Sequence, residues 1–126
     1  MRRAELLLAL LLGAPALGCR GASTALADYR VSTGGDPARG EAVIRRVGCG
    51  SCHTIPGVRG ARGLVGPPLY FFSRRTMIAG ELPNTSENLV RWLRDPQQVE
   101  RGTAMPNLGL TDRQARDVAA YLYTLE

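Results

Sequence analysis

The segment Cys49-Gly50-Ser51-Cys52-His53 constrains this chain more than any other part of its sequence. The pattern Cys-x-x-Cys-His is the attachment signature of c-type haem. Two thiols at this spacing reach the two vinyl groups on one side of a porphyrin, and the next residue turns an imidazole toward the iron. The sequence therefore predicts one haem c, covalently bound through Cys49 and Cys52, with His53 as an iron ligand.

Other uses of these residues fit less well. A redox-active dithiol is typical of a βαβ unit in which a helix starts at the first cysteine, whereas here a predicted helix ends there. A structural zinc site takes four Cys or His ligands, and no second pair accompanies Cys49 and Cys52. A disulfide scaffold is excluded, because three cysteines allow only one bridge.

The N-terminus reads as an export signal. Residues 1–5 are short and positive, residues 6–12 are continuously apolar, and residues 14–18 are mostly small. This order is that of a secretory signal peptide, and the apolar run is too short for a transmembrane helix. We therefore expect residues 1–18 to be removed, with the protein in the periplasm or at the outer face of the cytoplasmic membrane. Because the protein is expected to be exported, we exclude nucleic acid as a partner.

Two cleavage sites compete. The segment Pro15-Ala16-Leu17-Gly18-Cys19 resembles a bacterial lipoprotein box, in which Cys19 becomes the lipidated first residue and anchors the protein to a membrane surface. The rival, Ala25-Leu26-Ala27, would release a soluble protein. We favour lipidation, because an exported protein rarely keeps a lone free thiol. Residues 19–35, rich in small and polar residues, are expected to form a flexible tether.

Residues 36–126 are predicted to form one all-α domain with three main helices. The start and stop signals are Asp36-Pro37 and Gly48 for the first helix, Asn84 with Glu87 and Asp95-Pro96 for residues 86–94, and Thr111 with Gln114 for a helix that continues to the C-terminus. The loops at 56–68 and 101–109 are rich in glycine and proline. Three helices and long loops should not hold together on apolar side chains alone, so we expect a group such as a haem to fill the centre of the domain.

The second iron ligand follows from the few candidates that the chain offers. His53 is the single histidine, the chain has no lysine, and both motif cysteines are consumed. Met77, Met105 or an open position remain. Met105 lies in a constrained loop after a helix that could cover the far face of the haem, whereas Met77 suits packing. We expect Met105 to be the ligand.

These features together resemble the class I cytochromes c, which are small single-haem proteins. The resemblance covers residues 34–126 and rests on the haem motif, Gly66-Pro67-Pro68-Leu69 and Gly102-Thr103-Ala104-Met105-Pro106, in the family order. It implies the cytochrome c fold, with long loops wrapped around the haem. It also implies that Gly40 and Ile44 meet the last helix.

The resemblance assigns roles to further residues. The Pro67 carbonyl would accept a hydrogen bond from His53 Nδ1, Leu69 would pack on the haem, and Trp92 would lie beside the methionine ligand, where its indole N–H could donate. Thr103 would reach a haem propionate. His53 and Met105 would complete the coordination of the iron.

The implied function is one-electron transfer rather than enzyme catalysis. Three versions stay open: a monomeric carrier that delivers electrons in a respiratory chain to a terminal oxidase, a fixed cytochrome subunit of an oxidase or dehydrogenase complex, and a haem peroxidase or gas sensor with a labile Met105. The redox partners would be an oxidase, a cytochrome bc-type complex or a dehydrogenase.

Two groups of side chains have less certain roles. The chain carries 16 Arg against 11 acidic residues, an excess that could steer docking to acidic surfaces; Arg74 or Arg75 could instead pair with propionates. Tyr70, Phe71 and Phe72 could form an apolar wall of the haem site or simply anchor a loop.

Overall fold

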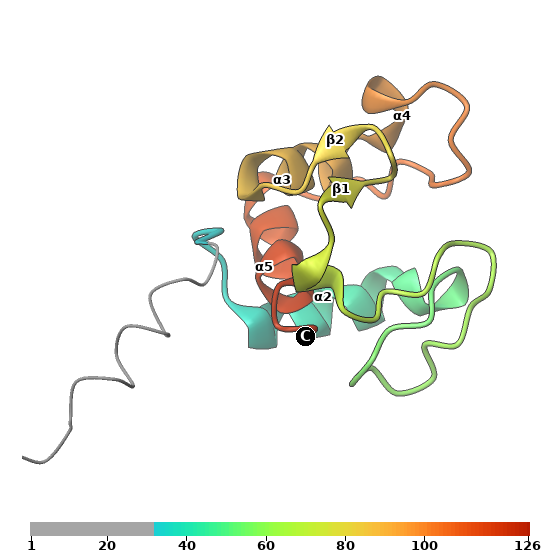
Figure 1. The fold of residues 1–126 in the computed structure, drawn as a ribbon. Helices are drawn as coiled ribbons and strands as arrows, with labels where there is room; N and C mark the ends of the chain where they lie inside the picture. Colours follow the sequence, from blue (N-terminus) through green and yellow to red (C-terminus); the bar gives the residue numbers. More distant parts are fainter. Residues whose placement is uncertain (1–31) are drawn as a thin grey trace, which may run out of the picture.

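The computed structural model describes residues 32–126 (Figure 1). The predicted signal peptide, Cys19, the rival cleavage site and most of the tether lie outside the described residues. The elements in chain order are α2 (Pro37–Val47), η1 (Cys49–Ser51), η2 (Phe72–Arg74), β1 (Met77–Ile78), β2 (Leu82–Pro83), α3 (Ser86–Arg94), α4 (Pro96–Val99) and α5 (Asp112–Leu122). Strands β1 and β2 form a short antiparallel hairpin. No helix within residues 32–126 is long and apolar enough to cross a membrane.

This part of the chain is mainly α-helical, as predicted, but with four helices rather than three. The short helix α4 was not expected: Asp95-Pro96 ends α3 and also starts α4, because the Asp95 side chain accepts a hydrogen bond from the amide of Gln98. Helix α3 has the predicted bounds, but its cap is Thr85, which accepts from the amide of Asn88, and not Asn84 of the predicted start signal. Helix α5 ends at Leu122, before the C-terminus.

Helix α2 ends where the haem motif begins. Asp36 caps its start by accepting from the amide of Arg39 at 2.9 Å, and Pro37 occupies the first turn, where its missing N–H is not needed. Gly48 ends the helix with a φ of 85°, a left-handed conformation that glycine adopts readily. The turn η1, with the motif cysteines, follows at once.

Helices α2 and α5 cross in close contact at Gly40. A Cβ atom on Gly40 would lie 2.6 Å from the carbonyl carbon of Asp117 and 3.0 Å from Cβ of Tyr121. Ile44, one turn further along α2, is 1% exposed in the same core as Ala115 and Val118 of α5. The crossing thus needs a residue without a side chain on α2.

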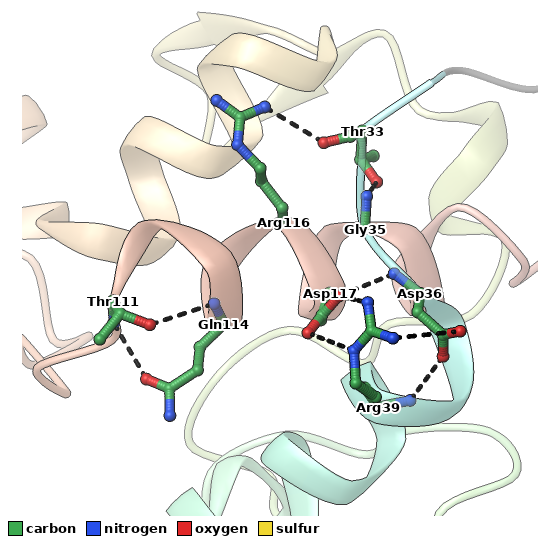
Figure 2. A network of polar contacts seen from close by, with 8 residues as sticks. All are labelled: Thr33, Gly35, Asp36, Arg39, Thr111, Gln114, Arg116 and Asp117. Atoms are coloured by element: carbon green, nitrogen blue, oxygen red, sulfur yellow. Dashed lines mark hydrogen bonds and ion pairs between the residues drawn. The ribbon is translucent and has the colours of Figure 1, made fainter.

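A charged network ties the start of α2 to α5 (Figure 2). The buried Asp117 accepts from Arg39 Nε at 3.1 Å, from a terminal guanidinium nitrogen of Arg39 at 2.9 Å, and from the amide of Asp36 at 2.7 Å. The hydrogen bonds from Arg39 hold the pKa of Asp117 below its usual range, outweighing the opposite effect of burial.

Residues 32–35, the last part of the predicted tether, lie against the helices. Thr33 is buried, and its carbonyl accepts from Arg116 of α5 at 3.1 Å (Figure 2). The carbonyl of Ser32 accepts from the hydroxyl of Ser86 at the start of α3. Residues 32–35 are therefore held by contacts to both α3 and α5.

The C-terminal residues hold the segment that leads to β1. The Leu125 carbonyl accepts from both the amide and the hydroxyl of Ser73. The Tyr123 hydroxyl donates to the Asn84 side chain at 2.8 Å, and the amide nitrogen of that side chain donates to the carbonyls of Phe72 and Arg75. Burial raises the pKa of Tyr123 to about 12.

The crossing predicts that Gly40→Ala destabilises the protein. Alanine normally favours a helix over glycine by about 1 kcal/mol, but here its methyl group would collide with the backbone of Asp117. We expect a net loss of about 1–3 kcal/mol in the free energy of unfolding, measured by urea denaturation. A gain in stability would contradict the close crossing.

The charged network predicts an acid-dependent loss in Asp117→Asn. Because the pKa of Asp117 is lowered on folding, its ionic stabilisation is complete above the usual aspartate pKa and is lost as the pH falls through the lowered value. We expect the variant to lose about 1–3 kcal/mol at neutral pH and to approach the parent protein in acid. The control is Asp112→Asn, at a half-exposed ion pair, which should cost less than about 1 kcal/mol; equal losses at all pH values would contradict the assignment.

Candidate functional site

The site is a mostly apolar cavity of about 580 Å³ between the helical core and two loops. These loops, which follow η1 and α4, extend from the same side of the helices (Figure 1). The residues expected to bind the haem or its iron line the cavity: Cys49, Cys52, His53, Pro67, Leu69, Trp92, Thr103 and Met105. The fold thus brings together residues that lie far apart in the chain.

The motif follows the end of α2 as a tight turn. The amides of Cys52 and His53 both donate to the carbonyl of Cys49, at 3.2 and 3.0 Å. Cys49 and Cys52 form no disulfide with each other and are half-buried, and burial raises the pKa of the Cys49 thiol. The turn therefore presents two thiols and one imidazole to the same cavity.

The His53 ring is oriented by the backbone of Pro67. Its Nδ1 lies 2.8 Å from the Pro67 carbonyl oxygen. A carbonyl oxygen only accepts, so Nδ1 carries the hydrogen and Nε2 of the neutral ring keeps its lone pair. That is the tautomer which a metal-binding histidine needs.

Gly66 packs directly against the His53 ring. A Cβ at Gly66 would lie 2.7 Å from Nδ1 and 2.9 Å from Nε2. The Gly66 amide donates to the Cys52 carbonyl at 2.8 Å, and the Leu69 amide donates to the Thr54 carbonyl at the same distance. The loop is thereby fastened to the motif, and the absence of a side chain at Gly66 leaves room for the imidazole.

Arg75 closes the far end of this loop. Its guanidinium donates to the Pro68 carbonyl and, at 3.2 Å, to the Tyr70 carbonyl, and it lies 5.5 Å from the centre of the Phe72 ring.

Of the three aromatic residues considered for an apolar wall, only Phe72, which is 5% exposed, lines the cavity. Tyr70 and Phe71 are 48% and 57% exposed and lie outside the cavity lining, so of the two roles left open for them the structure does not favour the wall.

The other loop contributes Met105, which is half-buried. Met77 of β1 also lines the cavity but is 42% exposed. Trp92 is 8% exposed at the cavity wall, and within residues 32–126 its indole N–H has no hydrogen-bond acceptor. Gln97 of α4, which no pattern in the sequence marks, also contributes here: its side chain donates to the carbonyls of Thr103 and Met105.

A second hollow, of about 420 Å³, lies away from the motif between α3, α4 and the loop before α5. Its lining includes Arg91, Arg94 and Gln98 but no cysteine, histidine or methionine. It therefore lacks the groups that the predicted chemistry needs.

The first cavity fits a covalently bound haem. Its lining supplies two thiols for the thioether bonds, an imidazole with Nε2 available, a methionine thioether, and apolar walls for a flat macrocycle. In the described part of the chain, no three His, Cys, Asp or Glu side chains gather as a metal site would require. The donor set is thus that of a haem protein.

Comparison with known proteins agrees with this chemistry. Residues 37–126 match the family model of cytochrome c. The chain is also similar to proteins named cytochrome c oxidase subunit 2: 35% identical over 70% of this chain in Alkalihalophilus pseudofirmus, 36% over 69% in Bacillus sp. PS3, and 29% over 79% in Bacillus subtilis. These matches cover 25%, 25% and 29% of those proteins, so the chain spans about a quarter of the length of its curated relatives. The chain belongs to the cytochrome c family of electron-transfer haem proteins, as a class I c-type cytochrome.

Proposed function

We propose that this protein is an electron carrier with one haem c, bound through Cys49 and Cys52 and ligated by His53 and Met105. The observation that carries the proposal is the gathering of these four side chains around one apolar cavity. The bound haem supplies an iron that cycles between Fe(III) and Fe(II).

The protein's own residues serve this role by holding their positions. Pro67 and Gly66 orient the His53 ring, so its Nε2 needs little movement when an electron arrives. Buried Phe72 and Trp92 keep water from the cavity, and a methionine ligand favours the reduced state over the oxidised one. With His53 and Met105 as its two protein ligands, the iron would have no free position for oxygen, which favours a carrier over an enzyme.

A terminal oxidase is the acceptor that we propose. The matched relatives are named as subunits of cytochrome c oxidase, and this similarity also supports a second function, that of a fixed cytochrome subunit in an oxidase complex. A dehydrogenase or a cytochrome bc-type complex would be the donor. Exposed arginines in the loop after η1, Arg59 and Arg62, and Arg74 of η2 would steer docking to acidic surfaces.

We also propose that the protein is exported and held at the outer face of the cytoplasmic membrane by a lipid on Cys19. The apolar run and the cysteine that follows it support this placement. Mass spectrometry of the protein purified from cells tests it: a diacylated N-terminal Cys19 supports the anchor, and an unmodified N-terminus at Asp28 would refute it.

The ligand set is tested by absorption spectra of the haem-loaded protein. We expect a low-spin ferric spectrum with the weak long-wavelength iron–thioether band, and no change when carbon monoxide is added to the ferrous protein. Met105→Ala should abolish the band and allow carbon monoxide to bind, whereas the control Met77→Ala should retain the band. A high-spin parent protein that binds carbon monoxide readily would instead support a peroxidase or gas sensor.

Carrier and subunit differ in how tightly the protein is held by its partner. A carrier must dissociate, so it should separate from the oxidase when detergent-solubilised membranes are diluted or exposed to high salt, which screens contacts between charged surfaces. The measurement is the haem c content of the purified oxidase fraction. Stoichiometric co-purification at every dilution and salt concentration would replace the carrier with the subunit.

A further inference from the structure

We propose that Gln97 is a positioning residue that holds the Met105 loop against the cavity and so sets how firmly Met105 occupies its place. The inference rests on the proposed role of Met105 as an iron ligand. It concerns a side chain that lies outside the haem motif and outside the methionine loop itself.

The side chain of Gln97 uses both ends of its carboxamide on that loop. Nε2 donates to the carbonyl of Thr103 at 2.7 Å and to the carbonyl of Met105 at 3.0 Å. Oε1 accepts from the amide of Gly102 at 3.2 Å. Both N–H groups of the amide are therefore engaged, and they bind main-chain carbonyls on either side of Ala104.

Helix α4, which carries Gln97, is itself held in place. Helix α4 is short, but Asp95 caps its start and Pro96 at its first position is buried. The Glu100 amide donates to the Pro96 carbonyl at 2.9 Å and closes the helix. A side chain on this turn can hold a neighbouring loop without moving with it.

Apart from the packing of Met105 and Leu108 on the core, the loop has few other hydrogen bonds in the described structure. It contains no helix or strand between α4 and α5, and the link from the Thr103 amide to the Glu100 carbonyl, at 3.2 Å, is its main internal turn. Gly102, with a φ of 85°, turns the chain back toward α4. Since Met105 is tied through its own carbonyl to Gln97, loosening that bond lets the methionine move away from the cavity.

The role depends on hydrogen-bond donation, not on size. Glutamate matches glutamine in length and volume and can still accept from Gly102, but an ionised carboxylate has no N–H to offer to two carbonyl oxygens. Gln97→Glu should therefore fail as Gln97→Ala does. A role in packing alone would leave the glutamate variant unchanged, which separates the two explanations.

The test uses the haem-loaded protein and imidazole as an added ligand. Imidazole binds only when the methionine position is open, so its apparent affinity rises with the open fraction. We expect both Gln97 variants to weaken the ferric iron–thioether band and to raise the apparent affinity for imidazole about tenfold, equivalent to about 1.4 kcal/mol. The matched control is Gln98→Ala, because the neighbouring Gln98 side chain is exposed and makes no hydrogen bond within the described residues; it should behave as the parent protein.

The outcomes separate this inference from the proposed function. If Met105→Ala loses the band while both Gln97 variants keep the parent band and imidazole affinity, the role of Gln97 is refuted and the ligand assignment stands. If Gln97→Ala shows the effect and Gln97→Glu does not, the Gln97 side chain acts through packing and not through hydrogen-bond donation, and the inference is also refuted. If Met105→Ala retains the band, the ligand assignment fails, and the role of Gln97 fails with it.

Discussion

The placement of the haem motif depends on the close crossing of α2 and α5 at Gly40. Because the two backbones meet directly at this point, the end of α2 at Gly48 has a defined position relative to α5, and the motif emerges there as a tight turn. The buried Asp117 holds the same two helices together by charge. Helix packing thus positions the motif, and the loop that follows it orients the imidazole through Pro67.

The two loops that complete the cavity are held in a different way. They have almost no strand pairing, and side chains from neighbouring elements donate to their main-chain carbonyls instead. Arg75 does so at Pro68, the Tyr121 hydroxyl at Pro56 with a distance of 2.7 Å, and Gln97 at Met105. An irregular loop held at a few carbonyls keeps the shape of the cavity without needing regular structure of its own.

The sequence predicted those features whose causes are local. The ends of α2 follow from Asp36, Pro37 and Gly48, and the start of α5 from a capping box whose two hydrogen bonds lie within four residues. The cavity residues were predictable because the haem motif and the two loop motifs occur in a known order, and the structure gathers them as expected.

The missed features have different causes, and one of them depends on contacts between distant segments. Asn84 and Thr85 are both suitable helix caps, and only the partners of Asn84 in Phe72 and Tyr123 decide between them. The dipeptide Asp95-Pro96 carries signals for both the end of one helix and the start of another. The exposure of Phe71 follows from its left-handed backbone, with a φ of 54°, which places the ring beside Arg74 at the surface. Its hydrophobicity alone gave no sign of this.

Residues 32–35 enter the domain on the opposite side from the two loops that line the cavity. Thr33 is fastened to α5 and Ser32 to α3, on the side of the helices away from the two loops (Figure 1). The chain before residue 32 therefore joins the domain at a point apart from the residues that line the cavity. A change in the length of that chain would leave the cavity lining itself untouched.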